Sequence, residues 1–175
     1  MYHIQIVLFF VSLIIAAYLD LKNGTIPDWL TLTVTAAAII ISFFCRGLTG
    51  LAGSMLGWAI GFFPFYVLHR MGGMGGGDVK LMGMVGALGG AGFIIYCYWY
   101  TALVGLIMAL GLLLIKGKIK EGWIRTRTLF HRVSHMRFKE NPADPAAAHS
   151  CPPLSIPYGM AIVTGAYITF FVKII

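Results

Sequence analysis

Residues 81–115 have the sequence LMGMVGALGGAGFIIYCYWYTALVGLIMALGLLLI and contain no charged side chain. They belong to an apolar region that runs from Val79 to Ile115, interrupted only by Lys80. A transmembrane helix needs about 20 apolar residues, so this region is too long for one span and fits two helices that meet near residues 89–92. Working outward, other apolar runs cover residues 4–19, 29–45, 51–68 and 158–175. The sequence therefore predicts an all-α membrane protein with six transmembrane helices.

The overall composition supports a membrane protein. Of the 175 residues, 59% are hydrophobic and 11% are charged, and the mean hydropathy is +0.85. Soluble domains are about 25% charged, and one of this size could not bury so much apolar surface. The composition excludes a soluble enzyme, a disordered chain and a disulfide scaffold, and the apolar runs are too long for barrel strands of about 9–11 residues. We expect a single membrane domain over residues 1–175.

The basic residues predict the orientation of the six spans. Only Arg46 and Lys173 fall on one side, whereas the other Lys and Arg lie in the loops after the first, third and fifth spans. By the positive-inside rule these three loops face the cytoplasm, and both termini face outside. We therefore attribute the net charge of +7 to membrane topology, and we expect no nucleic-acid partner. The predicted location is the plasma (inner) membrane.

Three of the six acidic residues lie at predicted membrane boundaries on the cytoplasmic side: Asp20, Asp28 and Asp78. An ionisable group at membrane depth costs about 3 kcal/mol, which makes such residues candidates for function. Asp20 ends a predicted helix, where the helix dipole disfavours a negative charge. Asp28 follows Pro27 and fits a helix start, so we interpret it as a capping or turn residue.

Asp78 follows a glycine-rich segment, residues 72–77, in which only Met74 is not glycine. Glycines are costly in chain entropy unless the backbone takes an unusual conformation or packs closely. Two carboxyls on one side of a helical bundle, Asp20 and Asp78, suggest aspartic acid/base chemistry, because a close pair that shares one proton can activate water and polarise a carbonyl. No Ser/His/Asp set, Cys/His pair or metal cluster competes for this role, and the three cysteines lack metal or redox spacing.

Three segments resemble the type IV prepilin peptidase family. Residues 18–28, YLDLKNGTIPD, resemble the family segment that follows the first span. Residues 75–81, GGGDVKL, match the family's GxGD box and its usual continuation. Residues 156–161, IPYGMA, resemble the start of the family's final helix. The three motifs occur in the family's order and extend over nearly the whole chain.

The resemblance implies an intramembrane aspartic endopeptidase that removes the short basic leader of prepilins at the cytoplasmic face, typically after Gly. By motif position the catalytic pair would be Asp20 and Asp78. The supporting motif residues would be Gly75, Gly77, Lys80, Pro27 and Asp28. The implied partners are a prepilin with a basic leader and a hydrophobic helix, the lipid bilayer, and pilus assembly or secretion machinery.

The chain departs from the longer bacterial members of this family, which add a cytoplasmic domain with two Cys-x-x-Cys pairs and methylate the new pilin N-terminus. This sequence begins almost directly with its first apolar run and contains no Cys-x-x-Cys. In its length and short N-terminus, the chain resembles the short tight-adherence (Flp-type) or preflagellin peptidases. The resemblance therefore implies peptidase activity without methyltransferase activity, and neither a metal nor another cofactor.

Residues 116–156 form a predicted basic cytoplasmic loop. Its first part combines Lys and Arg with apolar residues at roughly helical spacing, which favours an amphipathic helix on the anionic inner leaflet. A partner-docking surface is the alternative. The later part, residues 141–153, is rich in Pro and Ala and is expected to be a linker.

Two other functions compete with a peptidase. In a proton- or cation-coupled small transporter, Asp20 and Asp78 would relay ions, but the sequence shows no convincing internal repeat of the kind that many transporters contain. In a structural membrane subunit of a secretion machine, both acids would tolerate replacement by Asn. Cleavage, ion flux and tolerance of substitution distinguish the three functions.

Overall fold

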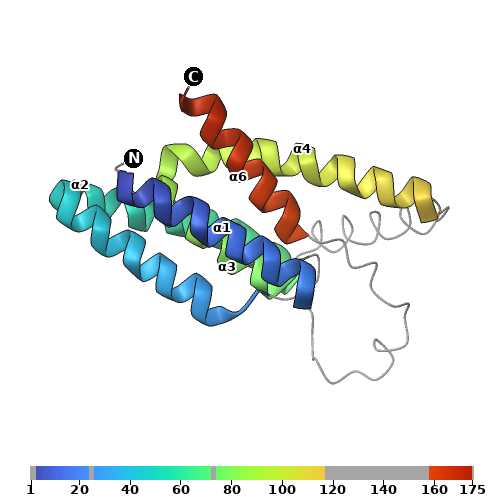
Figure 1. Ribbon diagram of the computed structural model, residues 1–175, viewed down its shortest axis with the longest axis horizontal. Helices are drawn as coiled ribbons and strands as arrows, with labels where there is room; N and C mark the ends of the chain where they lie inside the picture. The colour runs from blue at the N-terminus through green and yellow to red at the C-terminus, as the bar shows by residue number, and fades with distance from the viewer. Residues whose placement is uncertain (1–2, 24–25, 72–73, 117–157, 175) are drawn as a thin grey trace.

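The computed structural model describes residues 3–23, 26–71, 74–116 and 158–174 (Figure 1). Apart from Lys116, the predicted loop over residues 116–156 lies outside the described residues. Every regular element in the described part is an α-helix, as predicted. The elements are α1 (His3–Asn23), α2 (Asp28–Arg70), α3 (Gly76–Gly89), α4 (Ala91–Lys116) and α6 (Tyr158–Ile174).

Helix α2 reverses direction at Gly47. This residue has φ 61° and ψ −143°, a left-handed backbone conformation that glycine adopts without a steric penalty. In a straight helix Ser42 and Gly50 would be about 12 Å apart. Instead, a Cβ atom placed on Gly50 would overlap the carbonyl oxygen of Ser42. The two halves of α2 therefore pack side by side, in agreement with the two separate apolar runs predicted at 29–45 and 51–68 (Figure 1).

Helix α3 forms the centre of the bundle. All residues from Leu81 to Leu88 are buried, including Met82 and Met84 with 0% exposure. A helix that is apolar on every side is typical of an element surrounded by other helices. At 14 residues α3 is about 21 Å long, which is shorter than the roughly 30 Å hydrocarbon core.

Glycines allow the second half of α2 to approach α3 at backbone distance. A Cβ atom on Gly57 would lie 2.8 Å from the Cα of Gly90 and closer still to the carbonyl oxygen of Gly86. One turn later, a Cβ atom on Gly61 would lie 2.5 Å from the carbonyl oxygen of Met82. Because the position on α3 decreases as the position on α2 increases, the two segments are antiparallel. Small residues at such spacing let membrane helices pack without intervening side chains.

Aromatic side chains join α1 to α6. Phe9 stacks on Phe170 with a centroid distance of 5.7 Å, and Phe10 contacts Tyr167 at 5.3 Å. Near the other end of α6, Gly159 lies against Asp20 in the last turns of α1. The two helices are therefore antiparallel, and the start of α6 lies next to the end of α1 (Figure 1).

Three described helical segments are long and apolar enough to cross a membrane: Ile4–Lys22, Asp28–Arg70 and Ala91–Gly111. Large apolar side chains such as Val7, Phe44 and Trp99 remain exposed on their outer faces, as expected for lipid-facing surfaces. The apolar helix Tyr158–Lys173 is shorter. The count of six spans and the outward placement of both termini stay predictions.

Candidate active site

Asp78 lies in the first turn of α3, and the glycines before it explain its position. Gly75 is the N-cap of α3, which makes Asp78 the third helical residue. A carboxylate at this position reaches back to the backbone N–H of the N-cap, which would otherwise be unsatisfied. The Asp78 carboxylate accepts such a hydrogen bond from the N–H of Gly75. The Gly-x-Gly-Asp spacing thus fixes the acid against the start of its own helix.

Asp20 lies in the last turns of α1 and is only 9% exposed. Its carboxylate accepts a hydrogen bond from the backbone N–H of Met160, in the first turn of α6. The first N–H groups of a helix lack partners within the helix, and the helix dipole favours an anion there. The start of α6 thus provides Asp20 with the favourable electrostatic environment that the end of α1 does not.

The two carboxyls act on each other electrostatically. Burial, together with repulsion from the Asp20 carboxylate, raises the pKa of Asp78 to about 6. Asp20 and Asp78 come from α1 and α3, which are separated in sequence by the whole of α2. The fold therefore brings together the two acids that were singled out in the sequence.

One oxygen of the pair has no protein partner within the described part of the chain. Asp20 Oδ2 is buried and makes no hydrogen bond to any described residue. A buried carboxylate oxygen without a partner is costly, and it is suited to hold a shared proton or to accept one from water. The arrangement can thus supply one acidic and one basic carboxyl group at the same place.

The supporting motif residues connect the starts of α2 and α3. Pro27 is the N-cap of α2 and lies immediately before the helix, outside its first turn. Asp28 is the first helical residue, and its Oδ1 lies 2.6 Å from Nζ of Lys80. A Cβ atom on Gly77 would lie 3.3 Å from the backbone N of Ile26. Lys80 therefore pairs with Asp28 and ties the segment that carries Asp78 to the start of α2.

His69 contacts the same glycine-rich segment from the end of α2. Its Nδ1 lies 2.8 Å from the carbonyl oxygen of Met74, a distance that fits donation by the ring N–H. The ring also lies within 3.5 Å of the position of a Cβ atom on Gly76. Nothing in the sequence distinguishes His69, because a single His at a helix end carries no distinctive pattern. No group of three His, Cys, Asp or Glu side chains suited to a metal ion occurs among the described residues.

Comparison with known proteins places the chain in a family. Residues 7–110, which include both Asp20 and Asp78, match the type IV leader peptidase family. The chain belongs to this family. It is thus a peptidase, and its long apolar helices make it a membrane protein. No curated protein and no solved structure gives a significant match.

Gly159 lies at the candidate site of this leader peptidase, beyond the matched region, and only the structure shows its proximity to Asp20. A Cβ atom on Gly159 would lie 2.5 Å from Asp20 Oδ2 and 2.8 Å from its Cγ. A glycine is therefore required for the Asp20 carboxyl to lie against the start of α6. The IPYGMA segment contained the signal, but nothing in the sequence connected it to Asp20.

Replacing Gly159 by Ala should abolish most activity with little loss of stability. The new methyl group would displace a carboxyl at the end of a flexible side chain, so the backbone could stay in place while Asp20 is misaligned. A misplacement of about 1 Å typically costs on the order of 100-fold in rate. We expect a loss of this size in kcat, measured by cleavage in detergent, and an almost unchanged melting temperature.

The matched control is Gly105→Ala. Gly105 is also a helical glycine, but a Cβ atom there would meet Ala161 Cβ at 3.8 Å, an ordinary contact. This variant should keep the activity of the unmodified protein. Equal activity of the Gly159→Ala and Gly105→Ala proteins would show that Gly159 does not position Asp20.

Proposed function

We propose that this leader peptidase is an aspartic prepilin peptidase with Asp20 and Asp78 as its catalytic pair. It hydrolyses the bond after the short basic leader, typically after Gly, of type IV or Flp-type prepilins. The observation that carries the proposal is that the Asp20 and Asp78 carboxyls are near enough to repel each other: burial, and then the charge of Asp20, raise the pKa of Asp78 to about 6. Membership of the leader peptidase family supports the same reaction.

The pair would work by sharing one proton. The ionised carboxyl takes a proton from a water molecule as the water oxygen attacks the scissile carbonyl carbon. The protonated carboxyl donates its proton to the carbonyl oxygen, which gives a neutral tetrahedral diol. When the C–N bond breaks, the amide nitrogen receives a proton from the acid that had taken it from water, and a diol hydroxyl returns its proton to the other carboxylate. The pair ends with one proton, as it began.

The site's surroundings support this chemistry. Asp20 is nearly buried and Oδ2 lacks a partner among the described residues, so a water or proton held there would be shielded from bulk solvent. Asp28 is exposed and paired with Lys80, which leaves it a structural role at the start of α2. Lys22 and Arg70 lie near the same end of the bundle, and the positive-inside rule would place this end in the cytoplasm of a plasma membrane protein.

A cleavage assay tests the proposed function. The purified full-length protein is reconstituted in liposomes with a prepilin segment that has a basic leader, a final Gly and a hydrophobic helix. We expect a single cut after the Gly, identified by the mass of both products. The released helix should stay unmethylated when S-adenosylmethionine is added.

Two controls make this assay decisive. A substrate with Val in place of the final Gly should be cut much more slowly. Cysteine accessibility should place residues 20 and 78 on the same face of the membrane. Absence of cleavage together with proton flux across the liposomes would favour a transporter, and residues 20 and 78 on opposite faces would refute an aspartic pair.

A further inference from the structure

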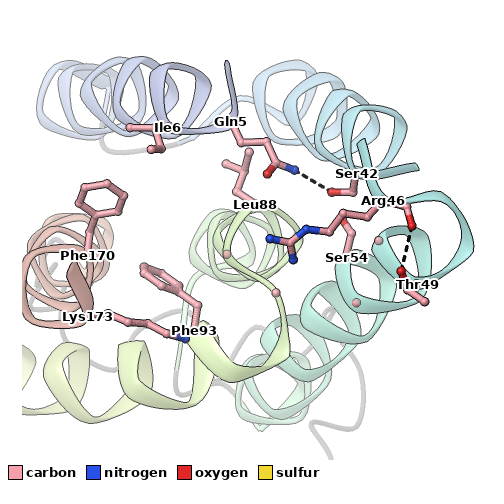
Figure 2. Close-up of a pocket in the computed structure, with 14 residues that line it drawn as sticks. Gln5, Ile6, Ser42, Arg46, Thr49, Ser54, Leu88, Phe93, Phe170 and Lys173 are labelled. Atoms are coloured by element: carbon pink, nitrogen blue, oxygen red, sulfur yellow. Dashed lines mark hydrogen bonds between the residues drawn. The ribbon is translucent and has the colours of Figure 1, made fainter. Parts of the chain in front are cut away.

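The two ends of the bundle are joined by different contacts, and only one end carries the aspartates. At the far end, Gln5 in α1 donates from Nε2 to Ser42 Oγ in α2 at 2.8 Å, beside a cavity of about 460 Å³ (Figure 2). Gln5 and Asp20 are separated by about 22 Å along α1, so this cavity is distinct from the candidate active site. The groups that position Asp78 lie at the other end, where α2 ends and α3 begins.

His69 lies at that end, in the last turn of α2, and its ring is bound to the segment before Asp78. Its Nδ1 lies 2.8 Å from the carbonyl oxygen of Met74. Because a carbonyl oxygen can only accept a hydrogen bond, Nδ1 must carry the proton that is donated. The rest of the ring lies beside Gly76, where a Cβ atom would be 3.5 Å from Cε1 and 3.7 Å from Nε2. The contact therefore requires the Nδ1–H of this imidazole.

The peptide group that His69 contacts is the one that holds Asp78. The carbonyl of Met74 and the N–H of Gly75 belong to the same peptide bond. That N–H donates to the Asp78 carboxylate. The carboxylate lies close to Gly75, since a Cβ atom on this glycine would be 3.1 Å from Asp78 Oδ2. His69 and Asp78 are therefore the two ends of a chain of two hydrogen bonds that passes through one planar peptide group.

Such a chain acts on both the direction and the strength of the bond to Asp78. The peptide group is planar, so a contact that fixes its carbonyl also fixes the direction of its N–H. Hydrogen bonds in a chain polarise one another, and donation to the carbonyl makes the N–H of the same group a stronger donor. Donation by His69 thus orients the N–H of Gly75 and strengthens its bond to the ionised carboxylate.

We propose that His69 is a positioning residue for Asp78, which it holds through the peptide group between Met74 and Gly75. The inference rests on the proposed function, in which Asp78 must exchange a proton with water and the scissile carbonyl in one geometry. Asn can present a side-chain N–H at the position of Nδ1 and should replace His69. Phe keeps a ring beside Gly76 but has no donor, and it should not replace His69.

Cleavage kinetics of the full-length protein in liposomes test this role. With the prepilin segment as substrate, His69→Phe should lower kcat about tenfold, the loss that one hydrogen bond accounts for, and should leave KM unchanged. His69→Asn should keep most of kcat. The matched control Tyr66→Phe removes a polar group from an exposed aromatic residue one turn earlier on α2, and it should cleave like the unmodified protein.

A spectroscopic measurement tests the two hydrogen bonds without relying on cleavage. Labelling the Met carbonyl with ¹³C and the Gly amide with ¹⁵N selects the Met–Gly peptide groups, which occur at residues 71–72, 74–75 and 82–83. The signal that Gly75→Ala removes is that of Gly75. Its amide proton should move upfield in Asp78→Asn and in His69→Phe, because both changes weaken the bond that it donates. His69→Asn should leave it near its original position, and the Gly83 signal should not move.

The outcomes separate this inference from the proposed function. If the unmodified protein does not cleave, the proposed function fails, and the Gly75 signal still decides whether His69 acts on Asp78. An unchanged kcat in His69→Phe, an equal fall in Tyr66→Phe, a fall that His69→Asn does not avoid, or a Gly75 signal that stays in place would overturn the role of His69. If His69→Phe does not fold, His69→Gln is measured instead, because its amide occupies the position of Nε2 and not that of Nδ1.

Discussion

Replacing Asp78 by Asn should abolish cleavage and at the same time stabilise the protein at neutral pH. Loss of general acid/base catalysis lowers rates by about 10²–10⁴-fold. The amide of Asn cannot exchange a proton with the other carboxyl, so it cannot replace the Asp. Asp20→Asn should have the same effect on activity. The rates are measured with the prepilin segment in liposomes, and Asp28→Asn, which removes only the exposed ion pair with Lys80, should keep most of the activity.

The stabilisation follows from the raised pKa of Asp78. In the folded protein the Asp78 carboxyl keeps its proton up to a pH of about 6, whereas its ordinary pKa is 3.8. Ionisation of Asp78 therefore opposes folding as the pH rises from the ordinary pKa to the raised one. The cost at neutral pH is at most about 3 kcal/mol, from about 1.4 kcal/mol per pKa unit. The melting temperature of Asp78→Asn should therefore exceed that of the unmodified protein at about pH 7.5 and match it at about pH 4.

Two results would contradict this account. Full cleavage by Asp78→Asn would remove Asp78 from the reaction. An equal difference in melting temperature at both pH values would show that burial and Asp20 do not oppose the ionised form of Asp78, and that the gain comes from packing alone.

Replacing Gly57 by Ala should have the largest effect on stability. The new methyl group would overlap the backbone of Gly86 and Gly90, and a backbone cannot move aside as a side chain can. Helices α2 and α3 would have to separate, at a cost of about 3 kcal/mol or more. A loss of roughly 10 °C in melting temperature follows for a chain of this size. Activity should fall in parallel, because α3 carries Asp78.

Gly53→Ala is the matched control. Gly53 lies one turn before Gly57, and a Cβ atom there would meet nothing within 4 Å. Since Ala is favoured over Gly in a helix by about 1 kcal/mol, this variant should be as stable as the unmodified protein or slightly more stable. Similar melting temperatures for the two variants would show that α2 and α3 are not held at backbone contact.

The sequence predicted those parts of the fold that depend on composition and on local signals. Long apolar runs predicted the helices. Two of these runs are separated at Gly47, whose left-handed backbone conformation ends a helix whatever surrounds it. The four-residue spacing of Gly57 and Gly61 is likewise typical of a face on which membrane helices pack closely. These features follow from chain entropy and polarity, which the sequence carries directly.

The candidate site was predictable in its residues but not in its contacts. Asp20 and Asp78 were recognisable because acids at membrane boundaries are costly. The N–H of Met160 that satisfies Asp20, the close approach of Gly159 and the anchoring by His69 all depend on which helix ends meet. Lys80 shows the same limit, since its partner Asp28 lies on another helix and no spacing rule connects them.

The hydrogen bond between Asp20 and Met160 has a consequence for biosynthesis. Asp20 leaves the ribosome early, whereas the N–H that holds its carboxylate is translated 140 residues later. Until α6 packs beside α1, the nascent chain contains both acids but lacks the N–H that holds Asp20. On the proposed function, a partly synthesised chain in the translocon would therefore not cut neighbouring membrane proteins before α6 is in place.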